Sequence, residues 1–241
     1  MWKRDHTLQA ATARVSLGDL EQMDTFVKKI QAMPALATQP KPAVFSPKLT
    51  ANGFPSKPIS WKDFQRKYLR REDGFKYEWV GGTIEKTIRS MDKTQLYLLY
   101  NLQVFFRQLL KEGKAHGDLI SEPDLFFLEN HRRPDICWLT DEQIYKLADP
   151  EVYEVPAFII EVISSNDQIN TIKKKMVNYR DAGVKAVWHI FPKYRQVDVY
   201  SGKNLEDMTV CSGEKICSAA PALPAFKLPA NAIFYRPDQP A

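Results

Sequence analysis

The sequence is poor in cysteine and contains no long apolar run. Its 241 residues include three cysteines, an odd number without Cys-x-x-Cys spacing, at Cys137, Cys211 and Cys217. This pattern argues against a disulfide framework and a structural zinc site, and favours packed thiols. The longest apolar runs fall well short of the ~18 residues that a membrane span requires, and no hydrophobic signal core follows the first residues. We therefore expect a cytoplasmic protein that does not enter a membrane.

Histidine is also scarce, and the positive charge surplus is small. The four histidines are scattered without ligand spacing, so they predict no metal site: His6, His116, His131 and His189. Only His131, beside two arginines, is placed to touch a phosphate. The formal net charge of +5 is compatible with a nucleic-acid partner but is common in proteins that never bind one. A hydrophobic content of 44% is enough to form a globular core.

Composition changes divide the chain into three parts. Residues 1–33 contain an amphipathic helix, because apolar residues recur there at steps of three or four after a serine cap. Residues 34–58 are rich in proline and predict a linker. Residues 59–241 form the main domain, in which we expect the following helices and strands: a helix at 60–70, a hairpin of 76–80 and 83–88 around Gly81-Gly82, a helix at 92–111, strands at 118–121, 125–128, 135–139 and 157–165, a helix at 168–182, strands at 186–191 and 196–200, and a hairpin of 209–211 with 215–217.

One carboxylate interrupts the most apolar of these strands. Glu161 lies within Ala157-Phe158-Ile159-Ile160-Glu161-Val162-Ile163, which has the composition of a central sheet strand. Burying an unpaired carboxylate costs several kcal/mol, on the order of the stability of a small domain. Glu161 therefore needs a counter-charge, a metal ion or a polar cleft beside it.

A second carboxylate begins another apolar strand. Alternation along Asp135-Ile136-Cys137-Trp138 sends Asp135 and Cys137 to one face and the other two side chains to the opposite face. If this strand neighbours the central one, Asp135 and Glu161 converge. Two carboxylates held close together favour a hard divalent cation such as Mg²⁺.

The helix after the central strand offers three lysines that could stabilise charge on a phosphate. The apolar residues Ile169, Ile172, Met176 and Tyr179 define its buried face at about 100° per residue. Lys174 then points away from the sheet, while Lys173 and Lys175 lie at the two borders of the buried face. Both border lysines remain candidates on this geometry.

The motifs occur in a characteristic order: Tyr77-Glu78-x-x-x-Gly82, Arg133-Pro134-Asp135, Glu161-Val162-Ile163-Ser164, Lys175-x-x-x-Tyr179-x-x-Ala182-Gly183-Val184, Trp188, Pro192 and Val197-x-Val199-Tyr200. This series resembles the Uma family of restriction-endonuclease-like proteins, within the PD-(D/E)XK nuclease superfamily, over about residues 59–234. The order is more specific than any single motif. The resemblance implies an α/β fold with a restriction-endonuclease-like mixed sheet flanked by helices, and it leaves the N-terminal helical extension outside.

The resemblance also implies roles for individual residues. Asp135 and Glu161 would bind a catalytic Mg²⁺, with the backbone carbonyl of Val162 as a further ligand and Glu78 as an auxiliary one. Lys175 matches the family's active-site lysine. The commoner superfamily pattern places a lysine two residues after the glutamate, where this chain has Ile163. The histidine that often begins the long helix is missing from residues 92–95.

Each of these residues also has a structural explanation. Asp135 could simply bond local backbone at the start of its strand. Glu161 could be satisfied by an ion pair with Lys175 or Arg133, without a metal. Glu78 could face solvent in the hairpin. The aromatic residues of the long helix are better explained as core than as a base-stacking surface: Tyr97, Tyr100, Phe105 and Phe106.

The sequence thus favours a magnesium-dependent endonuclease that hydrolyses DNA by means of a metal-activated water. Further basic residues would line the nucleic-acid path: Arg66, Lys67, Arg70, Arg71, Lys173 and Lys193. A homodimer would supply the two sites that cleavage of both strands requires. Two alternatives stay open. A catalytically inactive nuclease-like fold could act as a nucleic-acid or protein binding module, and the N-terminal helix could make the chain a docking subunit of a larger assembly.

Overall fold

A computed structural model describes residues 58–88, 96–164 and 169–237. The predicted N-terminal helix and the proline-rich linker, apart from Pro58, lie outside these residues. The first described helix, α2 (Trp61–Phe64), begins at Ser60, whose side chain accepts a hydrogen bond from the backbone N–H of Asp63. It continues as a π-helix, η1 (Gln65–Leu69). The predicted helix at 60–70 and its serine cap are therefore confirmed.

A small antiparallel sheet follows in the order β2-β1-β5-β4. Its strands are β1 (Phe75–Val80), β2 (Thr83–Ile88), β4 (Leu125–Phe127) and β5 (Asn130–Arg132). Gly81 and Gly82 join β1 to β2 with φ angles of 52° and 83°. Positive φ at both central positions is what a tight hairpin turn requires, and the predicted hairpin is confirmed. The short strand β5 was not predicted.

The larger sheet has six strands in the order β10-β9-β8-β7-β6-β3. These are β3 (Asp118–Ser121), β6 (Ile136–Leu139), β7 (Phe158–Val162), β8 (Ala186–Phe191), β9 (Gln196–Ser201) and β10 (Asp207–Ser212). Only β7 and β8 pair in parallel within it. Helix α5 (Ile169–Ala182) makes the crossover between them, as a parallel pair requires. The predicted mixed sheet is thus confirmed.

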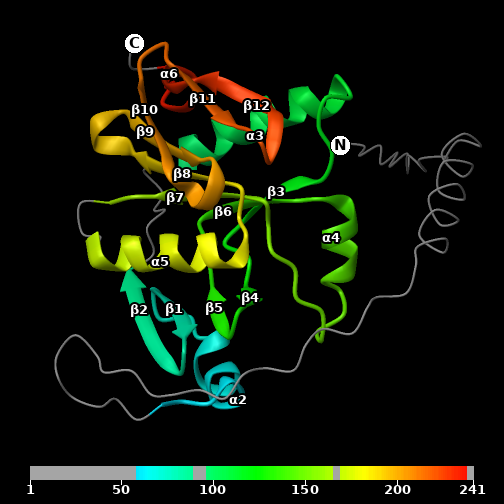
Figure 1. The fold of residues 1–241 in the computed structure, drawn as a ribbon, viewed down its shortest axis with the longest axis vertical. Helices are drawn as coiled ribbons and strands as arrows, with labels where there is room; N and C mark the ends of the chain where they lie inside the picture. Colours follow the sequence, from blue (N-terminus) through cyan, green and yellow to red (C-terminus); the bar gives the residue numbers. More distant parts are fainter. Residues whose placement is uncertain (1–57, 89–95, 165–168, 238–241) are drawn as a thin grey trace, which may run out of the picture. The chain divides into compact units, whose positions relative to one another are not determined.

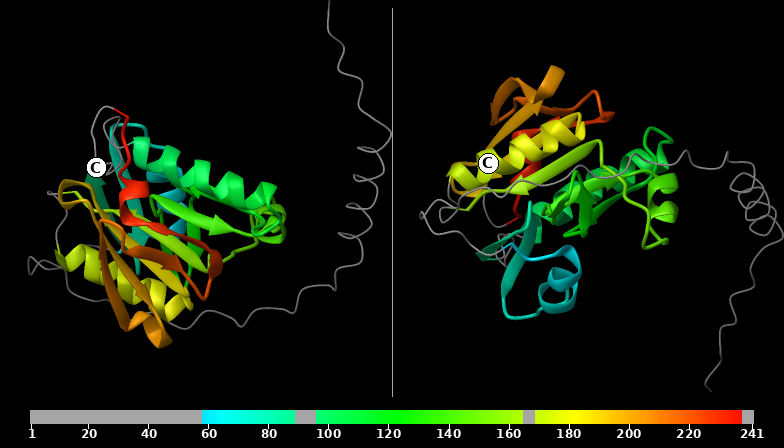
Figure 2. Two further views of the ribbon diagram at one scale, coloured as in Figure 1. Left: turned by 90° about the horizontal axis from the view of Figure 1, so that it is seen from above. Right: turned by 60° about the horizontal axis from the view of Figure 1, so that its bottom comes forward.

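Two helices cover opposite faces of this sheet (Figures 1 and 2). Helix α3 (Leu96–Lys111) packs through Leu98, Leu102 and Phe106 on one face, together with Ile136, Trp188 and other alternate strand residues. The intervening strand residues, such as Cys137 and Ile159, point to the α5 face. This is the alternation predicted for the strand at 135–139. The small sheet contacts the α5 side through the polar side chains described below.

The C-terminal region corrects one prediction. The strands at 209–211 and 215–217 do not pair with each other as a hairpin. Strand β10 pairs with β9, whereas β11 (Ile216–Ala219) pairs with β12 (Leu223–Pro229), which was not predicted. Phe226 of β12 explains the choice, because it stacks on Trp188 with ring centroids 5.5 Å apart and so extends the α3-side core. Local turn signals gave no indication of this long-range contact.

Two short helices complete the described chain, α4 (Asp141–Lys146) and α6 (Ala230–Ile233). None of the described helices is long and apolar enough to cross a bilayer. All three cysteines are free and buried, as predicted. Ile169, expected on the buried face of α5, is instead 61% exposed, at the first residue of the helix.

Candidate active site

A cluster of buried charged side chains lies between the small sheet, the end of β7 and helix α5. Strand β1 contributes Lys76 and Glu78, which are two residues apart and therefore share one face. Asp135 immediately precedes β6, and Glu161 lies near the end of β7. Helix α5 contributes Lys175 and Tyr179, which are neighbours one turn apart. Segments far apart in the sequence thus meet at one polar site.

Asp135 is fully buried and bonded through both carboxylate oxygens. Its Oδ1 lies 2.8 Å from the Nζ of Lys76, and its Oδ2 accepts a 2.7 Å hydrogen bond from the backbone N–H of Val162. In the antiparallel pairing of β6 with β7, Ile136 lies opposite Ile160. One step further along, Asp135 therefore comes beside Glu161. The predicted convergence of the two carboxylates is what the fold produces.

Glu161 is held by two groups from α5. The Nζ of Lys175 lies 3.0 Å from each of its carboxylate oxygens, and the Tyr179 hydroxyl donates to Oε1 at 2.5 Å. The ion pair with Lys175 that the sequence offered as a structural explanation is therefore present, whereas the Arg133 guanidinium pairs with Asp124. Lys173 and Lys174 are exposed, and Lys174 bonds Glu85 of β2 instead. Of the two border lysines, Lys175 is the one at the site.

Glu78 is 1% exposed, so it does not face solvent. Its Oε1 accepts the backbone N–H of Arg133 at 2.8 Å, and its Oε2 lies 3.0 Å from Nη1 of Arg132. Lys175 is 3.7 Å from Oε1, so this lysine links Glu78 to Glu161. The buried Arg132 guanidinium also bonds Glu85 at 2.5 Å and the Asn178 side chain of α5. It therefore ties the small sheet to the helix.

The pKa values show how strongly these charges act on one another. Burial raises the pKa of Glu161, with Lys175 opposing this effect and the Asp135 charge adding to it. For Glu78, the cost of burial is outweighed by Lys175 and Arg132, which bring its pKa down to about 2. Burial would lower the pKa of Lys76, but Asp135, Glu161 and Glu78 together raise it. Lys76 therefore stays protonated, and the three buried carboxylates lie beside three basic side chains: Lys76, Arg132 and Lys175.

Sequence reasoning missed three members of this cluster. Lys76 could have been found from its place two residues before Glu78 on the same strand face. Tyr179 was expected in the buried face of α5, but its hydroxyl contact with Glu161 was not. Arg132 gave no signal, because β5 itself was not predicted. The suggestion that His131 touches phosphate is wrong, because its side chain is 2% exposed and lies under the Trp61 and Phe64 rings.

The carboxylates have the chemistry of a site for a hard cation. Mg²⁺ is commonly bound by one or two protein carboxylates, with water and phosphate oxygens completing its shell. In the described ranges, no three or more histidine, cysteine, aspartate or glutamate side chains are arranged to hold a metal ion. An ion held by Asp135 and Glu161 would take most of its remaining ligands from water and phosphate oxygens. The ligand roles of these two residues, of Glu78 and of the Val162 carbonyl stay predictions.

His189 borders the same site on strand β8. The parallel register places it directly opposite Glu161. Its side chain is buried, and its ring meets the Tyr200 ring edge-on at 4.9 Å. Burial, with the nearby Lys175 charge, lowers the pKa of His189 to about 4. The imidazole is therefore neutral at physiological pH.

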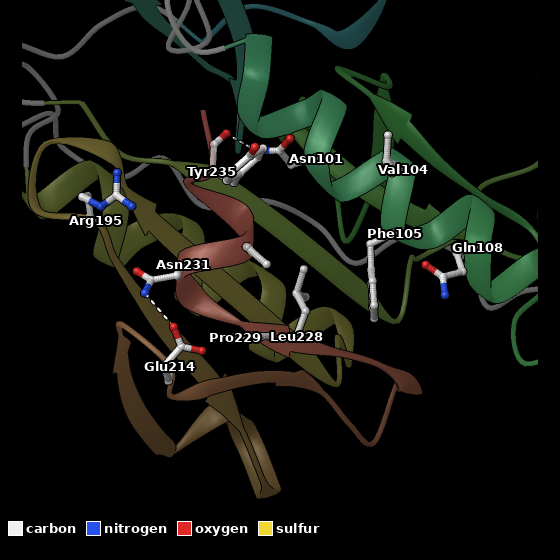
Figure 3. Close-up of a pocket in the computed structure, with 11 residues that line it drawn as sticks. Asn101, Val104, Phe105, Gln108, Arg195, Glu214, Leu228, Pro229, Asn231 and Tyr235 are labelled. Carbon is white, nitrogen blue, oxygen red and sulfur yellow. Dashed lines mark hydrogen bonds between the residues drawn. The ribbon is translucent and has the colours of Figure 1, made fainter. Parts of the chain in front are cut away.

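A pocket of about 450 Å³ lies elsewhere, between α3 and the β12–α6 segment (Figure 3). Asn101, Phe105 and Gln108 line it from α3, and Leu228, Asn231 and Tyr235 from the other side. Asn231 donates a hydrogen bond to Glu214 at its rim. None of the charged residues of the α5-side cluster lines this pocket.

Comparison with known proteins agrees with the fold. The profile of the Uma2 family, described as "Putative restriction endonuclease", matches residues 61–231. A crystal structure described as "a putative nuclease belonging to DUF820", from Anabaena variabilis ATCC 29413, superposes with a TM-score of 0.59 at 17% sequence identity. The match covers 73% of this chain and 98% of the other. Curated proteins give no significant match. The resemblance drawn from the ordered motifs is confirmed over nearly the same range.

Proposed function

Since the chain belongs to the Uma2 family, described as "Putative restriction endonuclease", we propose that it is a metal-dependent endonuclease that hydrolyses phosphodiester bonds of DNA. The observation that carries this proposal is the convergence of Asp135 and Glu161 from adjacent strands beside Lys175. A carboxylate pair next to an ammonium group can bind both a divalent cation and the phosphate that it activates. Mg²⁺ is the proposed cofactor.

Asp135 and Glu161 would hold the cation, with the Val162 carbonyl and Glu78 as further ligands. When bound, the cation would lower the pKa of an attacking water and offset charge on the phosphate oxygens. Lys175 would leave one of its carboxylate contacts to bind the phosphate or position the water. The Tyr179 hydroxyl and the Val162 N–H keep the two carboxylates oriented, because each donates to one of their oxygens.

The surface around the small sheet supports a polyanionic substrate. Lys67 and Arg70 of the α2–η1 segment are exposed, and Arg66 and Arg71 are exposed with carboxylate partners at 2.7 and 2.8 Å. Exposed cations of this kind bind phosphates without reading sequence. We extend the proposed path to Lys173 and Lys193, which are also exposed. Cleavage of both strands would require two sites, and hence a homodimer.

The test is a plasmid-nicking assay with Mg²⁺ or Mn²⁺ on the full chain. Glu161→Gln should reduce metal-dependent nicking on the order of 100-fold or more, since it removes a ligand from the step that the cation assists. Glu151→Gln makes the same chemical change at an exposed position and should retain full activity. Equal nicking by Glu161→Gln and the wild type, with both folded, would refute the proposal.

A second candidate function is a binding module that uses the same fold without catalysis. It is favoured by the charge balance of the site, because Lys76 and Lys175 already neutralise the two carboxylates. Under this alternative, DNA binding measured by fluorescence anisotropy would be independent of Mg²⁺ and of Glu161→Gln. Nicking would then be absent from every variant.

A further inference from the structure

Asp135 and Glu161 of the proposed metal site each form an ion pair with a lysine, and the two lysines differ in how deeply they are buried. Lys175 lies on the surface-facing border of α5, with 11% of its side chain exposed. Lys76 lies on β1, an inner strand of the small sheet, with 4% of its side chain exposed. Its hydrogen bond goes to Oδ1 of Asp135 at 2.8 Å. A buried lysine directed at a proposed ligand has no role in the mechanism above.

We infer that Lys76 is the counter-cation of Asp135 in the metal-free site. A divalent ion must displace Lys76 from Asp135 in order to bind, so Lys76 weakens the metal affinity of the site. The inference rests on the proposed function in taking Asp135 as a metal ligand. It goes beyond that function because it assigns control of metal binding to a residue outside the ligand set.

The two oxygens of Asp135 differ in how easily they can be freed. Oδ2 accepts from the backbone N–H of Val162, which is fixed within β7, a strand paired on both sides. Oδ1 accepts from the end of a lysine side chain with four rotatable bonds. A cation approaching Asp135 therefore competes with the Lys76 ammonium for Oδ1. Like charges repel strongly in a buried site, where water screens little.

The displaced ammonium would move toward a second carboxylate on its own strand. Glu78 is two residues along β1 and on the same face, and its charge acts on Lys76. If Asp135 and Glu161 hold the cation and Glu78 does not, moving from Asp135 toward Glu78 would keep Lys76 near a carboxylate while the cation takes its place. The exchange needs a change in the lysine side chain and no rearrangement of the strands.

The inference is tested by isothermal calorimetry of Mn²⁺ and Mg²⁺ binding to the full chain. Lys76→Met should bind the ions more tightly, on the order of tenfold, which lies within the usual range of coupling between sites. Lys76→Arg keeps the charge and should not gain affinity. The matched control is Lys227→Met, which removes the same charge from an exposed position on β12 and should bind as the wild type does.

The outcomes separate this inference from the proposed function. Tighter metal binding by Lys76→Met than by the wild type supports the inference about Lys76. This holds even if the wild type binds no detectable ion and cleaves no DNA. Unchanged or weaker binding by a folded Lys76→Met overturns it, as does absence of binding by both proteins. If Lys76→Met does not fold by circular dichroism, Lys76→Gln makes the same comparison while keeping a donor for Asp135 Oδ1.

Discussion

The buried imidazole of His189 provides a sharp test of the electrostatics at this site. The ring is neutral in the folded protein because burial and the Lys175 charge lower its pKa from 6.5 to about 4. In the unfolded chain it regains its ordinary pKa of about 6.5. Between these two values the unfolded chain binds a proton that the folded protein does not. The free energy of unfolding must therefore fall as the pH decreases through this window.

The size of the effect follows from the two pKa values. A difference of about 2.5, at about 1.4 kcal/mol per unit, gives about 3 kcal/mol between pH values above 6.5 and below 4. About 2 kcal/mol of this is already lost at pH 5 relative to pH 8. His189→Gln removes the titrating group while keeping a polar side chain of similar length. The free energy of unfolding of His189→Gln should therefore lack the decrease of about 2 kcal/mol between pH 8 and pH 5 that His189 causes.

The assay is urea unfolding of the wild type and His189→Gln from pH 5 to pH 8. Because other groups titrate equally in both proteins, the difference between their pH profiles isolates His189. Parallel profiles would refute the reasoning. An NMR titration of the ring gives a second check on the cause: Lys175→Met should raise the pKa of His189, because it removes a nearby positive charge.

Three other substitutions test the packing and hydrogen bonds around the site. Arg132→Met should lower the free energy of unfolding, measured in urea, by about 3–5 kcal/mol, because it leaves Glu78 buried without its guanidinium partner. A loss below about 1 kcal/mol would contradict the buried ion pair. Tyr179→Phe should lower the free energy of unfolding by about 1.5–3 kcal/mol, since the hydroxyl donates a hydrogen bond to the Glu161 carboxylate. An unchanged urea midpoint would show that this hydrogen bond is not formed in solution. Phe226→Ala should lower the free energy of unfolding by about 3–5 kcal/mol, because it leaves a cavity against Trp188. A loss within about 0.5 kcal/mol, as for a surface residue, would mean that β12 does not pack on the core.

Much of the fold and part of the site follow from local sequence patterns. The Gly81-Gly82 turn, the alternation around Asp135 and the apolar strand that contains Glu161 each depend on residues close together in the chain. Backbone geometry alone converts such patterns into a hairpin and into faces of a sheet. The same geometry identified Lys175 as one of two border lysines on α5. These features needed no knowledge of distant contacts.

Tertiary structure decided which of these pieces meet. The pairing of β11 with β12 instead of β10 depends on Phe226 reaching Trp188, a contact that no turn signal encodes. Lys76 joined the site through its long-range contact with Asp135, and Arg132 through its contacts with Glu78 and with Asn178 of α5. Packing then lowered the pKa of Glu78, because it brought the Lys175 and Arg132 cations from α5 and β5 beside this buried carboxylate. The sequence by itself determined that one carboxylate, Glu161, lies in a hydrophobic strand. Long-range packing determined its partners, Lys175 and Tyr179. The physical reason is that Coulomb energy depends on the distance between charges in space and not along the chain.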